Sequence, residues 1–128
     1  MRFLLFLLPL LTIEGLAVSY NWNGTTSTAW GTSTNWTPNG VPGSGDNVII
    51  FSSPNNPIYD GVAGVTDLTI TSGILDLGGF TLTTSGTNLF TSGTVQNGTL
   101  ASVSASNTTF NNTTFSANCI INITSGGI

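Results

Sequence analysis

Residues 68–87 read LTITSGILDLGGFTLTTSGT, and the next stretch, residues 88–107, reads NLFTSGTVQNGTLASVSASN. When the two stretches are aligned, apolar residues recur at the same positions, and residues 108–128 continue the pattern. Three apolar columns share this one period: Ile70, Phe90 and Phe110; Leu75, Val95 and Phe115; and Phe80, Leu100 and Ile120. Independent columns with one period indicate a solenoid, in which each repeat buries its apolar face by stacking on the next.

Each repeat contains three short strand-like segments. In the first repeat these are residues 68–70, 75–77 and 80–82, and each alternates apolar with polar residues, as a strand with one buried face does. Gly73 and the pair Gly78-Gly79 lie between them, where the chain must turn sharply. We therefore expect an all-β fold, a right-handed parallel β-helix with about 20 residues per coil and the three columns pointing inward. A β-sandwich is the alternative, since it also has short strands and frequent turns.

The third segment repeats less regularly than the first two. Its later copies carry apolar residues at other intervals: Leu100 and Val103, then Ile120, Ile121 and Ile123. A slip of one residue exchanges the inward and outward faces of a strand, so we expect a bulge or a shifted phase there. The register after residue 97 is left open.

The N-terminus has the features of a secretory signal peptide. Met1-Arg2 is a short positive segment, residues 3–13 are mostly apolar, and Gly15-Leu16-Ala17 offers small residues for cleavage. The apolar run is too short for a membrane-spanning helix, which needs about 20 residues. We expect cleavage after Ala17 and a secreted, extracellular or cell-surface location. A membrane anchor or a buried strand is the alternative reading of this segment.

Charge is scarce in the expected mature chain. It retains four aspartates and no Lys, Arg or His, with a net charge of −4. Nucleic acids and anionic membranes are bound through basic side chains, so we expect neither as a partner. No second apolar run of membrane length follows, and we expect no transmembrane span in the mature chain.

The mature chain divides into two parts. Residues 18–47 hold all three tryptophans, Trp22, Trp30 and Trp36, and we expect them to form an N-terminal cap. Residues 48–128 are expected to form the β-helix coils, because Val48 aligns with Leu68 and Ile50 with Ile70.

A specific block of residues opens the mature chain. It comprises Tyr20-Asn21-Trp22-Asn23-Gly24, Trp30, Thr34-Asn35-Trp36, Val41-Pro42 and Gly45-Asp46-Asn47-Val48-Ile49-Ile50. This block resembles the start of many large secreted bacterial β-helix proteins, including autotransporter-like proteins with β-strand repeats and surface adhesins. The segment at residues 75–82 is similar to a coil segment common in the same proteins. The resemblance implies an adhesin-like surface role and supplies no catalytic residues. Those proteins run to many more coils, so we expect the array at residues 48–128 to be incomplete at its C-terminus, the chain being a fragment.

The side chains of the mature chain offer little chemistry. Serine is abundant, but no His or Lys is present to activate it as a nucleophile. A zinc site would have one Cys and no His to use. Asp67 and Asp76 could form the carboxylate pair of a glycosidase, although turn caps or surface residues are the simpler interpretation. We therefore expect no enzyme activity, no cofactor and no bound metal.

Three further features have both a structural and a functional interpretation. Asp46 could contribute to a calcium site, or it could form an Asx turn before the strand at Val48. Cys119 is expected to be a buried thiol, because a lone cysteine cannot form an internal disulfide. The pairs Thr69/Thr71 and Thr81/Thr83 resemble ice-binding ladders, but one period further along the chain the ladder breaks.

The tryptophans also admit two interpretations. Exposed rings of Trp22, Trp30 and Trp36 could stack on sugars, whereas buried rings would cover the open end of the core. We expect capping, and a structural or adhesin-like module whose partners are surface glycans or other copies of the chain. The alternative hypothesis is the N-terminal part of a carbohydrate-active or carbohydrate-binding β-helix protein.

Overall fold

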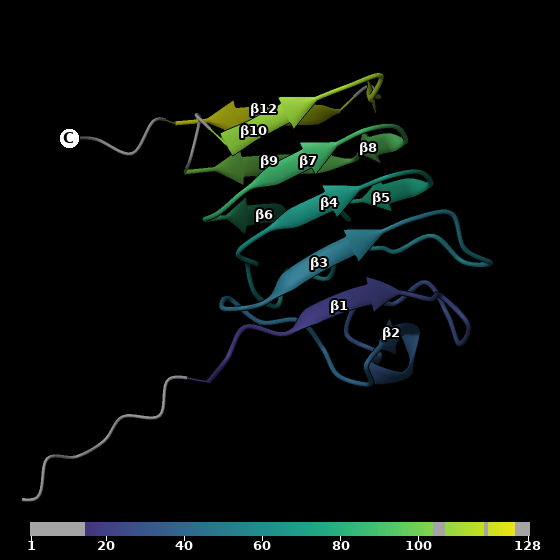
Figure 1. Cartoon of the computed structure of the whole chain (residues 1–128). Helices are drawn as coiled ribbons and strands as arrows, with labels where there is room; N and C mark the ends of the chain where they lie inside the picture. The colour runs from purple at the N-terminus through teal and green to yellow at the C-terminus, as the bar shows by residue number, and fades with distance from the viewer. Residues whose placement is uncertain (1–14, 104–106, 117, 125–128) are drawn as a thin grey trace, which may run out of the picture.

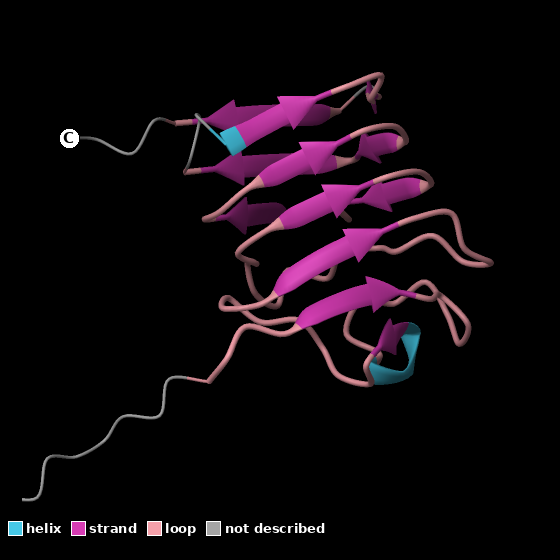
Figure 2. Ribbon diagram, viewed as in Figure 1, coloured by secondary structure: helices cyan, strands magenta, loops and turns pink. Residues whose placement is uncertain are grey.

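The chain folds as a parallel β-solenoid of about four turns with roughly 20 residues per coil, which confirms the expected fold class (Figures 1 and 2). The computed structural model describes residues 15–103, 107–116 and 118–124. Most of the expected signal peptide, residues 1–14, lies outside the described residues. The proposed cleavage after Ala17 therefore stays a prediction from the sequence.

Three sheets form the faces of the solenoid. Sheet A has six strands in the order β10 (Thr108–Phe110), β7 (Asn88–Phe90), β4 (Leu68–Ile70), β3 (Asn47–Ile50), β1 (Ser19–Trp22) and β2 (Trp36–Thr37). Sheet B has the order β11 (Thr114–Phe115), β8 (Thr94–Gln96) and β5 (Ile74–Asp76). Sheet C has the order β12 (Cys119–Ile123), β9 (Gly98–Ser102) and β6 (Thr81–Thr84). A short 3-10 helix, η1 (Ser33–Asn35), precedes β2.

The coil is right-handed. In Figure 1 the near strands β4 and β7 run to the right, and the far strands β6 and β9 run back to the left, while the chain climbs from β1 towards β12. All strand pairs are parallel except β1 with β2, which is antiparallel. Neighbouring strands therefore come from successive turns of the solenoid.

Sheets A and B keep the constant period expected from the sequence. Ile50, Ile70, Phe90 and Phe110 are successive partners in sheet A. Leu75, Val95 and Phe115 are successive partners in sheet B. Ile70, Leu75, Phe90 and Val95 are fully buried, so these two columns do point inward.

The third column was wrong at Phe80 and Ile120 and right at Leu100, which is buried, because the register of sheet C differs from that of sheets A and B. Leu82 pairs with Leu100, and Leu100 pairs with Ile121, so the first step is shorter than the common period and the second is longer. Phe80 and Ile120, expected inside, are 48% and 62% exposed. The shifted phase that the irregular spacing suggested is therefore present, and Phe80 lies in the bend before β6, with its ring at the surface.

One inward column of sheet A changes from apolar to polar between the third and fourth turns, while Phe90, Val95 and Leu100 keep the rest of that turn apolar. In sheet A the inward column runs from Val48 and Leu68 to Asn88. Asn88 Nδ2 donates a hydrogen bond to Ser102 Oγ at 2.9 Å and another to Thr108 Oγ1 at 3.2 Å. Ser102 is the sheet C partner of Thr84, which is also fully buried. These residues form a polar group inside the corner between sheets C and A.

Candidate functional site

The three tryptophans lie in the core at the N-terminal end of the solenoid. Trp22, Trp30 and Trp36 are all 0% exposed. The rings of Trp22 and Trp30 meet the ring of Trp36 edge-on, at centroid distances of 4.8 and 4.7 Å. Trp36 Nε1 donates a hydrogen bond to the carbonyl oxygen of Trp30 at 2.7 Å. No ring presents a face to solvent, so these residues are not sugar contacts here, and their packing agrees with the expected capping role.

Asn35 organises the loop that carries these rings, a role that the sequence did not reveal. Its Oδ1 accepts hydrogen bonds from the backbone N–H groups of Thr26 and Ser27, at 3.0 and 2.9 Å. Its Nδ2 donates to Ser27 Oγ and to the carbonyl of Ala29, at 3.0 and 2.9 Å. The side chain is fully buried and makes four hydrogen bonds, as a buried amide requires.

Three of the aspartates act as backbone caps. Asp46 accepts hydrogen bonds from the N–H groups of Val18 (3.0 Å) and Gly43 (2.9 Å), so its carboxylate closes a turn. Asp67 accepts from the N–H of Thr87 at 2.6 Å. Asp76 accepts from the N–H of Gly78 at 2.8 Å. These contacts favour the turn interpretation of all three over a calcium site or a glycosidase pair.

Asp76 is poorly suited to act as a general acid. Burial acts to raise its pKa, but hydrogen bonds from Gln96, Gly78 and Asn97 outweigh that effect, and the net pKa lies below the ordinary value. A general acid needs the opposite shift, so that it still holds a proton near neutral pH. Asp76 therefore remains an ionised anchor for the turn.

Uncharged residues dominate the outward rows of sheets A and C. In sheet A, Ile49, Thr69, Leu89 and Thr109 form one row. In sheet C, Thr81, Thr99 and Ile120 form another, and Thr83, Ala101 and Asn122 form a third. Apolar side chains interrupt every row of threonines, so the outward threonines form no continuous ladder of the ice-binding kind.

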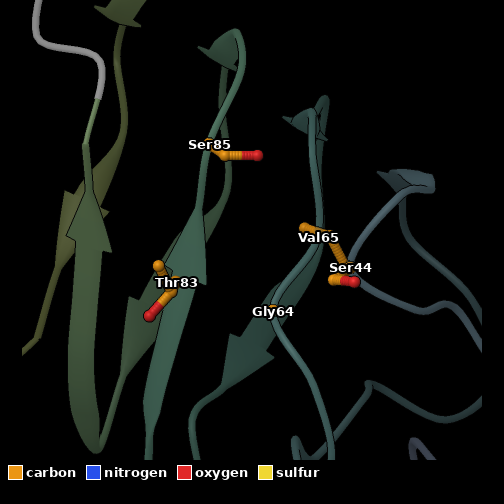
Figure 3. A pocket seen from close by; sticks show the side chains of 5 residues that line it. All are labelled: Ser44, Gly64, Val65, Thr83 and Ser85. Carbon is orange, nitrogen blue, oxygen red and sulfur yellow. The ribbon is translucent and has the colours of Figure 1, made fainter. Parts of the chain in front are cut away.

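A hollow of about 220 Å³ lies at the corner between sheets C and A (Figure 3). It is lined by Ser44, Gly64, Val65, Thr83 and Ser85. These residues come from three successive turns, and Val65 forms a parallel bridge with Thr84. The hollow is smaller than typical ligand pockets of about 300–1,000 Å³, and no titratable side chain lines it.

The most distinctive surface feature is the corner between sheets B and C. We call it the Phe80 corner and define it by Ile58, Asp60, Gly61, Asp76, Phe80 and Asn97. A Cβ built on Gly61 would lie 2.6 Å from Cδ1 of Phe80, so the ring rests on this glycine. A Cβ built on Gly78 would lie 3.5 Å from both Ile58 Cγ2 and Phe80 Cδ2, which places the two exposed apolar side chains together.

The same corner also carries polar side chains, and the carboxylate of Asp60 lies towards Gly31, where a Cβ would be 2.6 Å from its Oδ2. Asp76 Oδ2 accepts hydrogen bonds from Gln96 Nε2 and Asn97 Nδ2, both at 2.8 Å. Burial and the nearby charge of Asp60 raise the pKa of Tyr59, although its hydrogen bond to Ala63 acts in the opposite direction. The Tyr59 ring meets Phe80 edge-on, with the ring centroids 6.4 Å apart. The corner thus combines one half-exposed aromatic ring with two carboxylates and an amide.

Cys119 is a half-buried thiol in β12, where it packs against the core. Burial raises its pKa, so it is a weaker nucleophile at neutral pH than a free thiol. Among the residues that the structure describes, no group of three or more Cys, Asp and Glu side chains is arranged to hold a metal ion. In the same part of the chain, no helix has the length and hydrophobicity needed to span a bilayer.

Comparison with known proteins adds no assignment, since no protein-family model, curated protein or solved structure matches the chain.

Proposed function

We propose that this chain is a secreted or cell-surface β-solenoid module with an adhesin-like role, acting through contact and not through catalysis. The observation that carries the proposal is the pattern of the outward rows, in which Thr, Asn, Ile, Leu and Ala side chains alternate along stacked parallel strands. Such rows hold hydroxyl and amide groups at the regular spacing of a sheet, about 4.8 Å from strand to strand.

The hydrogen bonds that the aspartate carboxylates accept support a structural role for these residues and not a catalytic one. Asp46, Asp67 and Asp76 each accept a backbone N–H, which holds turns of the solenoid in place. The resemblance of residues 20–50 to the opening of secreted bacterial β-helix proteins supports the surface location, as does the leader-like segment at residues 1–17.

Secretion can be tested directly. The chain is expressed with its N-terminal segment in a secreting bacterial host, and the mass of the product outside the cytoplasm is measured. We expect a product that begins at Val18. A product retained in the cytoplasm at full mass would contradict the surface location.

Binding of the module to cell surfaces is tested by passing the purified product over immobilised bacterial and epithelial cells in a quartz-crystal microbalance. Because uncharged rows make the contact, we expect binding that changes little between about 0.05 and 0.5 M NaCl. Binding that collapses with salt, or release of soluble sugar from the surface, would contradict an uncharged, non-catalytic contact.

A further inference from the structure

We propose that removal of the leader after Ala17 converts the hydrogen bond between Val18 and Asp46 into an ion pair that fastens β1 to the solenoid. This inference rests on the proposed secretion of the chain and gives the processed end a role in the fold. Residues 18–128 contain no Lys, Arg or His, so the new α-ammonium group is the single cation of that part of the chain.

The residues before the expected cleavage point are accessible. Gly15, Leu16 and Ala17 are exposed, and a Cβ built on Gly15 would meet nothing within 4 Å. This segment leads away from the body of the solenoid before β1 begins at Ser19 (Figure 1). Val18 is half-buried. Cleavage between Ala17 and Val18 therefore removes no part of a sheet and places the new end at the edge of the folded body.

Asp46 already holds the nitrogen atom that cleavage charges. Its Oδ1 accepts a hydrogen bond from the N–H of Val18 at 3.0 Å, and its Oδ2 accepts one from the N–H of Gly43 at 2.9 Å. The N–H of Asn47 donates to the carbonyl oxygen of Val18 at 2.8 Å. The N–H of Thr66 donates to the carbonyl oxygen of Asp46 at 2.7 Å. Both partners are thus fixed, and groups fixed in this way lose little freedom when an ion pair forms.

Hydrolysis changes the charge at this contact. One water molecule adds across the peptide bond, so that the C–N bond breaks, the carbonyl carbon of Ala17 gains the hydroxyl and the nitrogen of Val18 gains a hydrogen. Near neutral pH the new carboxylic acid loses a proton and the new amine takes one up, which leaves an ammonium group with three N–H donors. A hydrogen bond between charged groups is about twice as strong as a neutral one.

The charged groups around the new end act in the same direction. Asp46 contacts the Val18 nitrogen directly. Asp67 occupies the same corner one turn further, before β4, and its carboxylate is bonded to the N–H of Thr87 in the turn beyond. Since residues 18–128 have no basic side chain, none competes with the α-ammonium group for Asp46.

The test compares the chain that begins at Val18 before and after acetylation of its α-amine. Because this chain has no lysine, the α-amine is its only amine, and the acetyl amide restores the neutral N–H of the uncleaved chain. At pH 7, acetylation should lower the thermal unfolding midpoint by about 3–5 °C. The chain is taken as the secreted product, or released from a cytoplasmic fusion protein by a protease, so the measurement does not depend on secretion.

Asp46→Asn should abolish the effect of acetylation, because the amide oxygen still accepts the N–H but carries no charge. Asp67→Asn is the matched control, since Asp67 also accepts a backbone N–H, from Thr87. Acetylation of this variant should lower the midpoint as much as it does in the wild type.

The pH dependence gives a readout that needs no variant. The ion pair should raise the pKa of the Val18 amine above its usual range of about 7.7–8.0, measured by the rate of acetylation against pH. The stabilisation is then fully present below the unfolded pKa and is lost as the pH rises through the folded pKa. The midpoints of the unmodified and acetylated chains should therefore converge between about pH 8 and 10.

The proposal is overturned if acetylation leaves the midpoint at pH 7 unchanged, or if it lowers the midpoint of Asp46→Asn as much as that of the wild type. If Asp46→Asn proves unfolded by circular dichroism, the pH dependence decides. A secreted product that begins at a residue other than Val18 would also overturn it, while the proposed location would stand. Retention in the cytoplasm, with the acetylation effect present in the released chain, would contradict the location alone.

Discussion

At the scale of single residues, Trp36 is the centre of the N-terminal cap. Three aromatic rings meet it edge-on: Tyr20 at 6.3 Å, Trp22 at 4.8 Å and Trp30 at 4.7 Å between centroids. Its backbone also pairs with Trp22, across the antiparallel strands β1 and β2. One side chain therefore joins the loop of the cap to the first strand of the solenoid.

Replacing Trp36 by alanine should destabilise the chain by about 3–5 kcal/mol, the usual cost of truncating a buried aromatic residue. Urea unfolding followed by far-ultraviolet circular dichroism measures the change in the free energy of unfolding. Val62→Ala is the control, because Val62 is 64% exposed and its truncation should change the stability little. A change below about 1 kcal/mol for Trp36→Ala would show that the cap does not support the coils.

A second residue-scale prediction concerns pH. The folded state holds the pKa of Asp76 below its ordinary value of 3.8, so ionised Asp76 stabilises the fold. That stabilisation is present above the unfolded pKa and is lost as the pH falls through the lower folded pKa. Asp76→Asn should be less stable than the wild type at pH 7, and its stability should fall less as the pH drops below about 4. Thermal unfolding across this pH range measures both effects, and identical acid profiles for the two proteins would contradict the assignment.

At the scale of elements, the register of sheet C decides which residues reach the surface. At the start of β9, Gly98 leaves no room for a side chain, since a Cβ built there would lie 2.5 Å from both Leu77 Cβ and the Phe80 carbonyl oxygen. The register also places Thr84 and Ser102 as buried partners beside Asn88. The hydrogen bond from Asn88 to Ser102 favours this register, whereas the buried Thr84 Oγ1 and Asn88 Oδ1 have no hydrogen-bond partner among the described residues.

A pair of engineered cysteines can distinguish the registers. In a Cys119→Ser background, Thr83→Cys with Ala101→Cys should form a disulfide on mild oxidation, because Thr83 and Ala101 are direct partners in β6 and β9. Thr83→Cys with Val103→Cys represents the constant period of the other two sheets and should stay reduced. Mass spectrometry after blocking of free thiols measures both pairs. Efficient cross-linking of the second pair alone would contradict the register.

At the scale of the whole molecule, stability is built by stacking. Each inner turn contacts the turn below and the turn above, so its strands depend on both neighbours. The N-terminal end is closed by the tryptophan cap and β2. The strands β4, β7 and β8 each lie between two other strands of their sheets, and β5 lies beside the isolated bridge between Ile58 and Asp76. The strands of the last turn, β10, β11 and β12, each pair on one side within the described residues.

Amide hydrogen exchange should therefore vary along the stack. In the full chain, the N–H of Thr91, bonded to Ile70 between the central turns, should exchange slowest. The N–H of Asn111, bonded to Phe90 at the last turn, should exchange faster, because Phe110 beside it is 38% exposed. Exchange followed by nuclear magnetic resonance measures both amides. Equal rates for the two would show that the solenoid opens as one unit.

The sequence by itself determined the fold class and two of its three inward columns. The common period places Ile70 under Phe90 and Leu75 under Val95, and the alternation within each strand fixes which of these faces is buried. It also placed the tryptophans at the end of the core. These features follow from local alternation and a regular repeat, which need no knowledge of distant contacts.

Only the tertiary structure decided the register of sheet C and the exposed position of the Phe80 ring. A short step followed by a long one brings Gly98 against the backbone of Phe80 and places Ser102 where its hydroxyl accepts a hydrogen bond from Asn88. Residues far apart in sequence make those contacts, so the repeat of apolar residues in the sequence does not reveal them. Phe80 lies in the bend before β6, outside the alternation of the strand, which is why its exposure was found in the structure and not in the sequence pattern.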